Sequence, residues 1–550
     1  DSIEPKKHVA RYSMHRYFTR RPFNVVQEYI KHFTNPGDVV LDPYVGTGVT
    51  VVEALVLRRR AMGVDIAPLS CFIAKNIAIS PVDIEKFKKA YHIIREIYQK
   101  EKFDKVKFEK INLSFLEEVK LPDNADVKTV KELFTPKQLW ALCLIMKEIN
   151  KINDNIIKDL MKFTFSSTLT FTNIMYNRGS SSPFAVYRYW VPKELQEVDV
   201  WDFFSRRYKA VLKGKEETNS LIGKFYNETN CKIFNKSATE LTKFIPENSI
   251  DYIFTDPPYG ANIAYLDLST MWDAWLGFKV DKKEREQEVI EGGTLKKSQE
   301  DYINLLTKSF REMYDVLKKD KWMSVVFHHK ELKLWNAVVN GAREAGFEYV
   351  NTVSQPSVVM PTFRKIQSPL RALAGELIIN FKKSKREKVN IIPVQSNLKG
   401  VILNTAERLI IQKNGATTDE IYHAIIPELL DANLIDLAVK EINDIIPLLK
   451  KEFDLDNNKW QLKKDAKIGS QIPKRDRIKF YLTSMLIREK ELDMDKIIAS
   501  LMPLLTNGHQ PDNKEIMEVL EEIAEPSDGK WKLKKQKFES KQTSLMNINQ

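Results

Sequence analysis

The feature that most constrains the fold is an alternation of helical and strand patterns between residues 22 and 80. The run FNVVQEYIKHF carries apolar side chains at helical spacing, and VVLD is a short apolar run typical of a buried strand. The Gly-rich turn PYVGTG leads into TVVEALVLRRR, predicted to be a helix that ends on basic residues, and AMGVD is a second strand ending at Asp65. This alternation predicts an α/β protein.

The same pattern resumes after a long helical interruption. Within residues 81–228, the run TPKQLWALCLIMKEIN has a strong helix start, with Thr135 as N-cap and Gln138 completing a capping box. Strand patterns return in CKIFN, SIDYIFT and WMSVVF, and FEYVNTVSQP and GELIINFKK are expected to form an antiparallel pair. Residues 1–80 and 229–384 are therefore expected to make one α/β core, with residues 81–228 as a large helical insertion.

The C-terminal region, residues 385–550, begins within the charged run KKSKREK and contains an internal repeat. DEIYHAIIPELL matches DKIIASLMPLL, and KWQLKK matches KWKLKK. Each copy has amphipathic helices followed by a short Trp-bearing strand, which resembles a winged-helix unit and predicts two small related subdomains. Winged-helix units bind DNA or dock proteins, and both roles stay open here.

Composition narrows the class of protein. Apolar residues make up 43% and charged residues 29% of the 550 residues, as in globular proteins. No apolar run approaches the roughly 18 residues of a membrane span, and the N-terminal residues lack the apolar core of a signal peptide. We therefore expect a cytoplasmic protein without membrane contact, trimmed at its N-terminus because it lacks an initiating Met. The net charge of +12 favours a polyanionic partner. The three cysteines fit no metal spacing and are expected to be reduced and buried.

The turn after the first strand has the composition of a ligand-binding turn. Gly46 and Gly48 allow the backbone to turn tightly and to approach a ligand. Two glycines without a basic residue do not make a phosphate-binding P-loop. Asp65, at the end of the next strand, has a spacing suited to a ribose diol, so the pair indicates a nucleoside cofactor. A purely structural tight turn remains the alternative.

The run DPPYG follows the apolar strand SIDYIFT. Pro257 and Pro258 end the strand and fix the residues around them. Asp256 and the Pro257 carbonyl can accept the two hydrogens of an exocyclic amine, and Tyr259 offers a ring on which a base can stack. Holding both hydrogens favours a pyramidal nitrogen whose lone pair faces an electrophilic methyl group, with no metal required. The alternative is a Pro-Pro strand terminator with an incidental Tyr.

Together, DPYVGTGVT and TDPPYG resemble the S-adenosylmethionine-dependent DNA amino-methyltransferases, the N6-adenine and N4-cytosine family. The resemblance covers residues 11–80 and about 231–383. It implies a Rossmann-like methyltransferase core, S-adenosylmethionine as cofactor, Asp256, Pro257, Pro258 and Tyr259 as catalytic residues, and double-stranded DNA as substrate. The implied cofactor-binding residues are Asp42, Pro43, Tyr44, Gly46, Thr47, Gly48, Asp65, Ile66, Ser237 and Ala238. The family usually has an acid where this chain has Ser237.

The resemblance also implies which base is methylated and which kinds of partner the protein has. The DPPY form is more typical of adenine enzymes, so transfer to adenine N6 by base flipping is expected, with cytosine N4 as the alternative. The resemblance implies a location in the cytoplasm with the nucleoid, and partner subunits from a restriction or phage-defence system. RNA guanine-N2 methylation and an inactive DNA-binding subunit are further alternatives. The helical insertion and the C-terminal region are rival candidates for reading the bases.

Several residues are candidates for contact with DNA. The segment FTFSSTLTFTNIMYNRGSSSPFAVYRYWVP is poor in helix formers and is expected to be a long ordered loop. Its possible DNA contacts are Asn173, Tyr176, Arg178 and Arg188, although an ordinary surface loop explains it equally well. In the helix YLDLSTMWDAWL, Tyr265 is a candidate wall of the base pocket, whereas Trp272 and Trp275 fit a core better. Arg16, Arg20 and Arg21 fit either an anionic ligand or a solvated terminus.

Overall fold

A computed structural model of the chain describes residues 3–6, 9–176, 188–329, 331–355, 376–384, 398–413, 415–442, 444–463, 474–501, 512–527 and 529–534. The chain divides into two compact units, residues 1–389 and 390–550. The first unit holds the central sheet and the helical insertion, and the second holds the repeated segments. Each unit is described by itself.

The first unit is built on a seven-stranded sheet in the order β3-β2-β1-β4-β5-β7-β6. Neighbouring strands are parallel from β3 to β5, and β7 runs antiparallel to both β5 and β6. This confirms the predicted α/β fold with a Rossmann-like core, including the antiparallel pair at its end. The strands are β1 (Val39–Asp42), β2 (Arg60–Asp65), β3 (Cys231–Asn235), β4 (Ile250–Thr255), β5 (Leu317–Phe327), β6 (Glu348–Gln355) and β7 (Glu376–Lys382).

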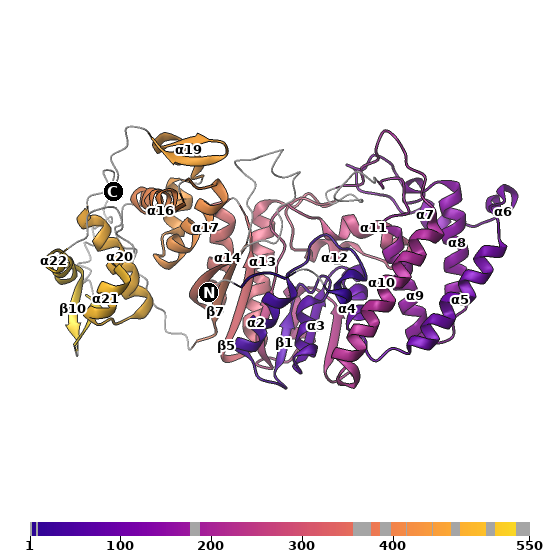
Figure 1. Cartoon of the computed structure of the whole chain (residues 1–550), viewed down its shortest axis with the longest axis horizontal. Coiled ribbons are helices and arrows are strands. Elements are labelled where there is room, and N and C mark those ends of the chain that lie inside the picture. The colour runs from indigo at the N-terminus through magenta and orange to yellow at the C-terminus, as the bar shows by residue number, and fades with distance from the viewer. Residues whose placement is uncertain are drawn as a thin grey trace, which may run out of the picture. The chain divides into compact units, whose positions relative to one another are not determined.

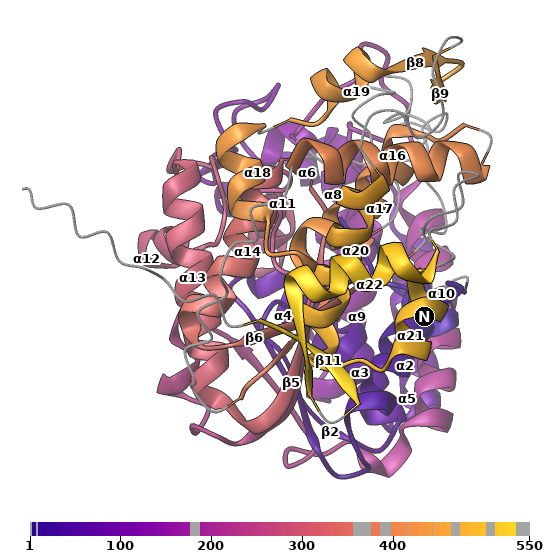
Figure 2. The same ribbon diagram turned by 90° about the vertical axis from the view of Figure 1, so that its left-hand side faces the viewer.

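Helices cover both faces of this sheet (Figures 1 and 2). On one face lie α2 (Phe23–Phe33), α3 (Val49–Val56) and α4 (Pro68–Ala78), and on the other lie η3 (Ala238–Lys243), α13 (Gln299–Val316) and α14 (Leu332–Ala345). The helix predicted for TVVEALVLRRR is shorter than expected. It ends at Val56 because Arg58 takes a left-handed conformation, with φ of 63°, and Arg59 turns inward to donate to the Thr34 hydroxyl.

The insertion is helical, as predicted, and packs against α4 (Figure 1). The capping box of Thr135 and Gln138 is confirmed. The insertion shares one hydrophobic core with the α2–α4 face of the sheet, so it belongs to the same packed body. Its elements are α5 (Ile84–Lys100), α6 (Lys105–Glu109), α7 (Ser114–Glu117), η1 (Lys131–Leu133), α8 (Pro136–Asn150), α9 (Asn155–Leu169), α10 (Val200–Leu221) and η2 (Gly223–Phe225); the short N-terminal helix α1 (Ala10–Ser13) packs on α10.

The long loop expected from residue 163 onward is wrong in its first part, which continues α9 to Leu169. The hydroxyls of Thr164 and Thr168 each donate to the carbonyl four residues earlier, so these polar side chains are satisfied while completely buried. The helix α11 (Tyr265–Leu276) is confirmed, followed by α12 (Lys282–Gln287). Trp272 and Trp275 lie in the core, and the Trp272 ring nitrogen donates to the Ser166 carbonyl at 2.9 Å.

The second unit contains two similar groups of helices, each ending in a β-hairpin, coloured orange and yellow in Figure 2. Both hairpins are antiparallel. In the first, a bridge joins Trp460 to Ala416, two residues before α17, and in the second, a bridge joins Trp531 to Leu492, two residues before α21. Equivalent bridges support the internal repeat. The elements are α16 (Leu398–Lys413), α17 (Thr418–Asp431), α18 (Ile435–Glu441), α19 (Ile446–Glu452), β8 (Phe453–Asp456), β9 (Lys459–Leu462), α20 (Lys474–Glu489), α21 (Met494–Leu501), α22 (Asn513–Ile523), β10 (Ala524–Ser527) and β11 (Lys530–Leu533).

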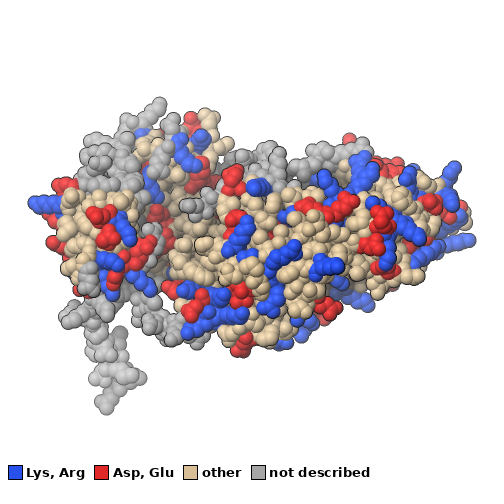
Figure 3. Space-filling view, turned by 60° about the horizontal axis from the view of Figure 1, so that its bottom comes forward, with Lys and Arg blue, Asp and Glu red and all other residues tan. Residues whose placement is uncertain are grey.

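The surface carries charges of both signs. On the face drawn in Figure 3, Lys and Arg side chains lie beside Asp and Glu side chains over much of the surface. This face therefore does not offer the uninterrupted basic stripe that marks a nucleic-acid footprint. Within the described ranges, none of the helices has the length and apolar character that crossing a bilayer requires.

Candidate active site

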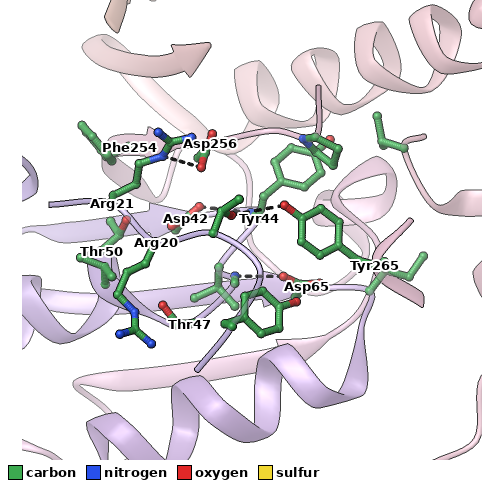
Figure 4. A pocket seen from close by; sticks show the side chains of 18 of the residues that line it. Arg20, Arg21, Asp42, Tyr44, Thr47, Thr50, Asp65, Phe254, Asp256 and Tyr265 are labelled. Atoms are coloured by element: carbon green, nitrogen blue, oxygen red, sulfur yellow. Dashed lines mark hydrogen bonds and ion pairs between the residues drawn. The ribbon is translucent and has the colours of Figure 1, made fainter. Parts of the chain in front are cut away.

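A pocket opens where three neighbouring parallel strands end. Asp42 ends β1, Asp65 ends β2, and Asp256 directly follows β4. Because the order of these strands is β2-β1-β4, the three acids stand in a row, with Asp42 in the middle (Figure 4). All three line one pocket, whose empty space, including the part open to solvent, is about 760 Å³. The pocket lies in the crevice outside the carboxyl ends of the strands, where open α/β sheets bind their ligands.

The Gly-rich turn forms the floor between two of these acids. Gly46 has φ of 49°, which favours glycine, and a Cβ added there would meet no atom closer than 3.9 Å. That Cβ would be in ordinary contact with the Tyr44 carbonyl and the Tyr17 ring, and the Gly46 N–H donates to the Asp65 carboxylate at 3.0 Å. Gly48 serves packing instead, since a Cβ there would lie 2.8 Å from the Ala74 Cβ. One glycine therefore borders the pocket and the other closes the turn onto α4.

Asp65 is held by its own backbone surroundings. One carboxylate oxygen accepts from the Gly46 N–H and the other from the Ala67 N–H, at 3.0 and 2.9 Å. Burial raises the pKa of Asp65 to about 6, although these two hydrogen bonds act to lower it. The Ser70 hydroxyl and the Ile66 N–H also act on this carboxylate to lower its pKa.

Asp42 is the most buried of the three acids. Its carboxylate accepts from the Tyr44 N–H at 3.2 Å and from the Thr255 hydroxyl at 3.1 Å, which ties the end of β1 to the end of β4. Burial raises the pKa of Asp42 to about 7, against hydrogen bonds that lower it. The side chain thus braces the two strand ends between which the pocket opens.

Asp256 is already engaged by protein groups. Arg21 donates from Nε to one carboxylate oxygen at 2.5 Å, and the Tyr259 hydroxyl donates to the other. Arg21 also donates from Nη2 to the Tyr259 hydroxyl, and its Nη1 pairs with Glu376 at the start of β7. Burial, the largest cause, raises the pKa of Asp256, and the Arg21 charge opposes that rise. The acid and the ring predicted to receive a base therefore form one cluster with a buried cation.

The prolines position this cluster. The Pro258 carbonyl accepts from the Tyr302 hydroxyl of α13 at 2.7 Å, which anchors the loop to the far face of the sheet. The Tyr259 ring packs edge-on against Phe327 at the end of β5, with ring centroids 5.0 Å apart. The loop is consequently fixed on two sides, while its Asp256 side remains at the pocket.

The structure brings most of the predicted site residues together. The pocket is lined by Asp42, Tyr44, Gly46, Thr47, Asp65, Ile66, Asp256, Pro258 and Tyr265. Pro43, Gly48, Pro257 and Tyr259 lie in the same two turns without lining it. Ser237 and Ala238 follow β3 and do not line it either; the Ser237 hydroxyl caps its own turn by accepting from the Thr239 N–H at 3.2 Å.

The predicted DNA contacts do not gather in one place. Asn173 is completely buried, donates to the Leu169 carbonyl at 2.6 Å and caps the end of α9, so its predicted contact with DNA is wrong. Tyr176 is half-buried against Phe171 and Phe203. Arg188 is exposed and pairs with Asp126 at 3.2 Å. Arg178 lies outside the described residues.

A strap across the pocket, residues 15–22, lies between α1 and α2; the sequence singled out its three arginines without placing them at the pocket. Of its side chains, Tyr17, Thr19, Arg20 and Arg21 line the pocket, and Tyr17 stacks on Tyr265 with ring centroids 6.0 Å apart. Arg20 is half-buried and donates to two backbone carbonyls of the strap region, and its buried Nε has no partner among the described residues. The strap is therefore not a solvated terminus. The cluster of arginines between α1 and α2 was its sequence signal.

The segment after α12 forms a wall of the pocket that the sequence analysis did not predict. Glu288 and Val289 line the pocket. Glu288 accepts from the Leu266 N–H at 3.0 Å, at the start of α11, and burial raises its pKa to about 7. The next segment is held to the DPPYG loop by a hydrogen bond from the Glu291 N–H to the Gly260 carbonyl at 3.3 Å. No local sequence signal marked this segment.

Comparison with known families agrees with this geometry. The model of the N6/N4 DNA methylase family matches residues 2–76 and 250–447, which include the Gly-rich turn, Asp65 and DPPYG. Most of the helical insertion lies between the two matched segments. The resemblance inferred from the two motifs is confirmed: the chain belongs to the DNA methylase family.

Curated relatives match parts of the chain. The type II methyltransferase M.MjaII of Methanocaldococcus jannaschii is 33% identical over 132 residues, which cover 24% of this chain and 23% of the relative. The type II methyltransferase M.MvaI of Kocuria varians is 25% identical over 256 residues, covering 44% and 51%. The chain thus spans about half or less of the length of these relatives.

Solved structures also align with the chain. A SAM-dependent methyltransferase from Methanosarcina mazei has 8% identity and a TM-score of 0.26, covering 65% of this chain and 98% of its own. An rRNA methylase from Streptococcus thermophilus has 6% identity and a TM-score of 0.25, covering 67% and 99%.

Proposed function

We propose that the chain is a DNA amino-methyltransferase that transfers a methyl group from S-adenosylmethionine to the exocyclic N6 amine of adenine. The observation that carries this proposal is that the Gly46 turn and Asp256 line one pocket on neighbouring strand ends. A cofactor on the first and a base on the second would face each other across that pocket. Membership of the N6/N4 DNA methylase family and relatives named type II methyltransferases support the same reaction.

The pocket has groups that fit S-adenosylmethionine. Asp65 lines the pocket with a carboxylate that suits the ribose hydroxyls, and the Gly46 turn brings the backbone to the pocket where the cofactor would lie. The buried Nε of Arg20 is a donor that has no partner among the described residues, and it suits the carboxylate of the methionine part. When bound, S-adenosylmethionine supplies a methyl group on a positively charged sulfur.

The residues of DPPYG would then prepare the amine. Asp256 and the Pro257 carbonyl accept its two hydrogens, which turns the nitrogen lone pair out of conjugation with the ring. Burial raises the pKa of the Asp256 carboxyl, which makes it a better acceptor for the proton that the amine must lose. Tyr259 supplies a ring for stacking a base swung out of the duplex. No step needs a metal.

Nucleoside analysis of the methylated nucleic acid tests which base receives the methyl group. We expect purified protein and S-adenosylmethionine bearing a labelled methyl group to label double-stranded DNA. Digestion of that DNA followed by mass spectrometry should give N6-methyladenine. N4-methylcytosine in its place would contradict the choice of base, and label in RNA with none in DNA would contradict the substrate. No label in either would contradict the proposed enzyme.

Cofactor binding should depend on the ionisation of Asp65. Because its pKa is about 6, lowering the pH below that value protonates the carboxylate and removes acceptors for the ribose. We expect the dissociation constant of sinefungin, measured by calorimetry, to rise by up to about tenfold per pH unit below this point. Asp65→Asn should bind weakly and lose most of this dependence. Asp42, with a pKa of about 7, also borders the pocket, and a dependence surviving in Asp65→Asn would assign the effect to Asp42 instead.

Two regions outside the catalytic core are candidates for binding the DNA duplex. We propose that the helical insertion, residues 81–228, and the repeated C-terminal region, residues 385–550, hold the duplex around the core formed by residues 1–80 and 229–384. Exposed Arg188, between α9 and α10 of the insertion, is a candidate phosphate contact. The type II names of the relatives support a role in a restriction-modification or phage-defence system, in the cytoplasm with the nucleoid.

A further inference from the structure

Arg21 occupies the place that the proposed function reserves for the target base. Its Nε and Nη2 donate to Asp256 and to the Tyr259 hydroxyl, and its guanidinium carbon lies 5.7 Å from the centroid of the Tyr259 ring. The Arg21 side chain is only 13% exposed, so this is an interior contact that water screens weakly. Figure 4 shows Arg21 pointing at Asp256 across the pocket.

A guanidinium group and an amino-substituted base present similar chemistry. Both are flat, both offer N–H donors in their plane, and both pack against aromatic faces. Asp256 and the Tyr259 ring are the acceptor and the stacking surface that a flipped base would need. A base therefore cannot use this carboxylate and ring as proposed while Arg21 stays where it is.

Glu376 gives Arg21 a second anchor. It pairs with Nη1, on the side of the guanidinium that does not contact Asp256, and its side chain is 30% exposed. Arg21 can therefore leave Asp256 without losing every negative partner, which lowers the cost of moving a buried cation. The strap that carries Arg21 also carries Thr19, which lies 3.4 Å from the hydroxyl of the pocket residue Tyr265.

We propose that Arg21 is a gate of the target-base site. Its guanidinium covers the Asp256 carboxylate and the Tyr259 hydroxyl before a base enters, and it withdraws toward Glu376 when a base arrives. This inference rests on the proposed function, because it takes Asp256 as the acceptor of the target amine. It assigns to the vacated site a ligand class, flat molecules with in-plane N–H donors.

The gate predicts opposite effects for its two partners. Arg21→Ala should bind deoxyadenosine at least tenfold more tightly than the wild type, and guanidinium ion should compete with it, because the ion refills the vacated place. Glu376→Gln should bind deoxyadenosine more weakly than the wild type, because Arg21 then has only Asp256 as a charged partner. The measurement is equilibrium binding in the presence of sinefungin, at alkaline pH so that Asp256 is ionised in every variant.

Arg16→Ala is the matched control. It removes an arginine from the same strap that packs on Phe171, 5.2 Å from its ring centroid, and should leave deoxyadenosine binding unchanged. Unchanged or weaker binding by Arg21→Ala, with sinefungin binding intact, would overturn the gate. So would a loss of binding in both Arg21→Ala and Glu376→Gln, which indicates a structural ion pair.

Methyl transfer by the wild type is scored separately. If the wild type methylates DNA and Arg21→Ala gains no affinity, the gate is wrong and the proposed function stands. If Arg21→Ala binds deoxyadenosine more tightly and guanidinium ion competes with it, but the wild type transfers no methyl group to DNA, the gate stands and the proposed function fails.

Discussion

Asp256→Ala is expected to lower the rate of methyl transfer by about a hundredfold to a thousandfold, the size seen when one preorganised group is removed from a reacting centre. The carboxylate would accept a hydrogen of the amine and then its proton, and no other acid contacts the Tyr259 hydroxyl in the described part of the chain. The measurement is single-turnover transfer of labelled methyl to DNA at saturating protein.

Two variants separate chemistry from folding in this experiment. Asp256→Asn keeps the shape and one oxygen for Arg21, and should retain sinefungin binding while losing nearly as much rate. Asp251→Asn changes an acid on the same strand that accepts from the Val39 N–H and Lys318, away from the pocket, and should keep its rate. A rate for Asp256→Ala within threefold of the wild type would refute the role of this carboxylate.

Glu53→Ala is expected to destabilise the protein by about 3 kcal/mol, because it leaves a buried cation without its buried partner. Glu53, on α3, is completely buried and accepts from Arg11 Nε at 2.8 Å, from the Tyr12 hydroxyl and from Gln27. It thereby clamps α1 and α2 to the helix that follows the Gly-rich turn. Chemical denaturation, read as the free energy of unfolding, measures the effect.

A substitution of an exposed acid, Glu28→Ala, is the control for the effect of Glu53→Ala on stability. Glu28→Ala removes a half-exposed partner of Lys31 and should change the free energy of unfolding by less than about 0.5 kcal/mol. Because Glu53 anchors both ends of the strap, Glu53→Ala should also weaken sinefungin binding, whereas Glu28→Ala should not. Equal effects of the two substitutions on stability would show that the buried network contributes no more than a surface pair.

The core of the fold was predictable because its signals are local. Helix α2 matches the predicted residues 23–33, and β1 and β2 end at the acids that the pattern identified. Parallel pairing then forces Asp42 and Asp65 to one edge of the sheet, so the cofactor side of the pocket follows from the sequence. DPPYG joins them for the same reason.

The parts that could not be predicted depend on tertiary contacts. Residues 163–169 look like a loop by propensity, yet they are helical because burial in the insertion outweighs propensity and the Thr hydroxyls bond within the helix. Asn173 looks like a polar loop residue but caps that helix from inside. Arg21 reaches Asp256, 235 positions away, and no local pattern reports such a pairing.

The central claim is that a cofactor on the Gly-rich turn faces Asp256 across one pocket, and a crystal structure with bound S-adenosylhomocysteine tests it most directly. We expect the ribose hydroxyls on Asp65, the adjoining chain over Gly46, and the sulfur directed toward Asp256. A ligand bound elsewhere, or bound here with its sulfur turned away from Asp256, would contradict the account.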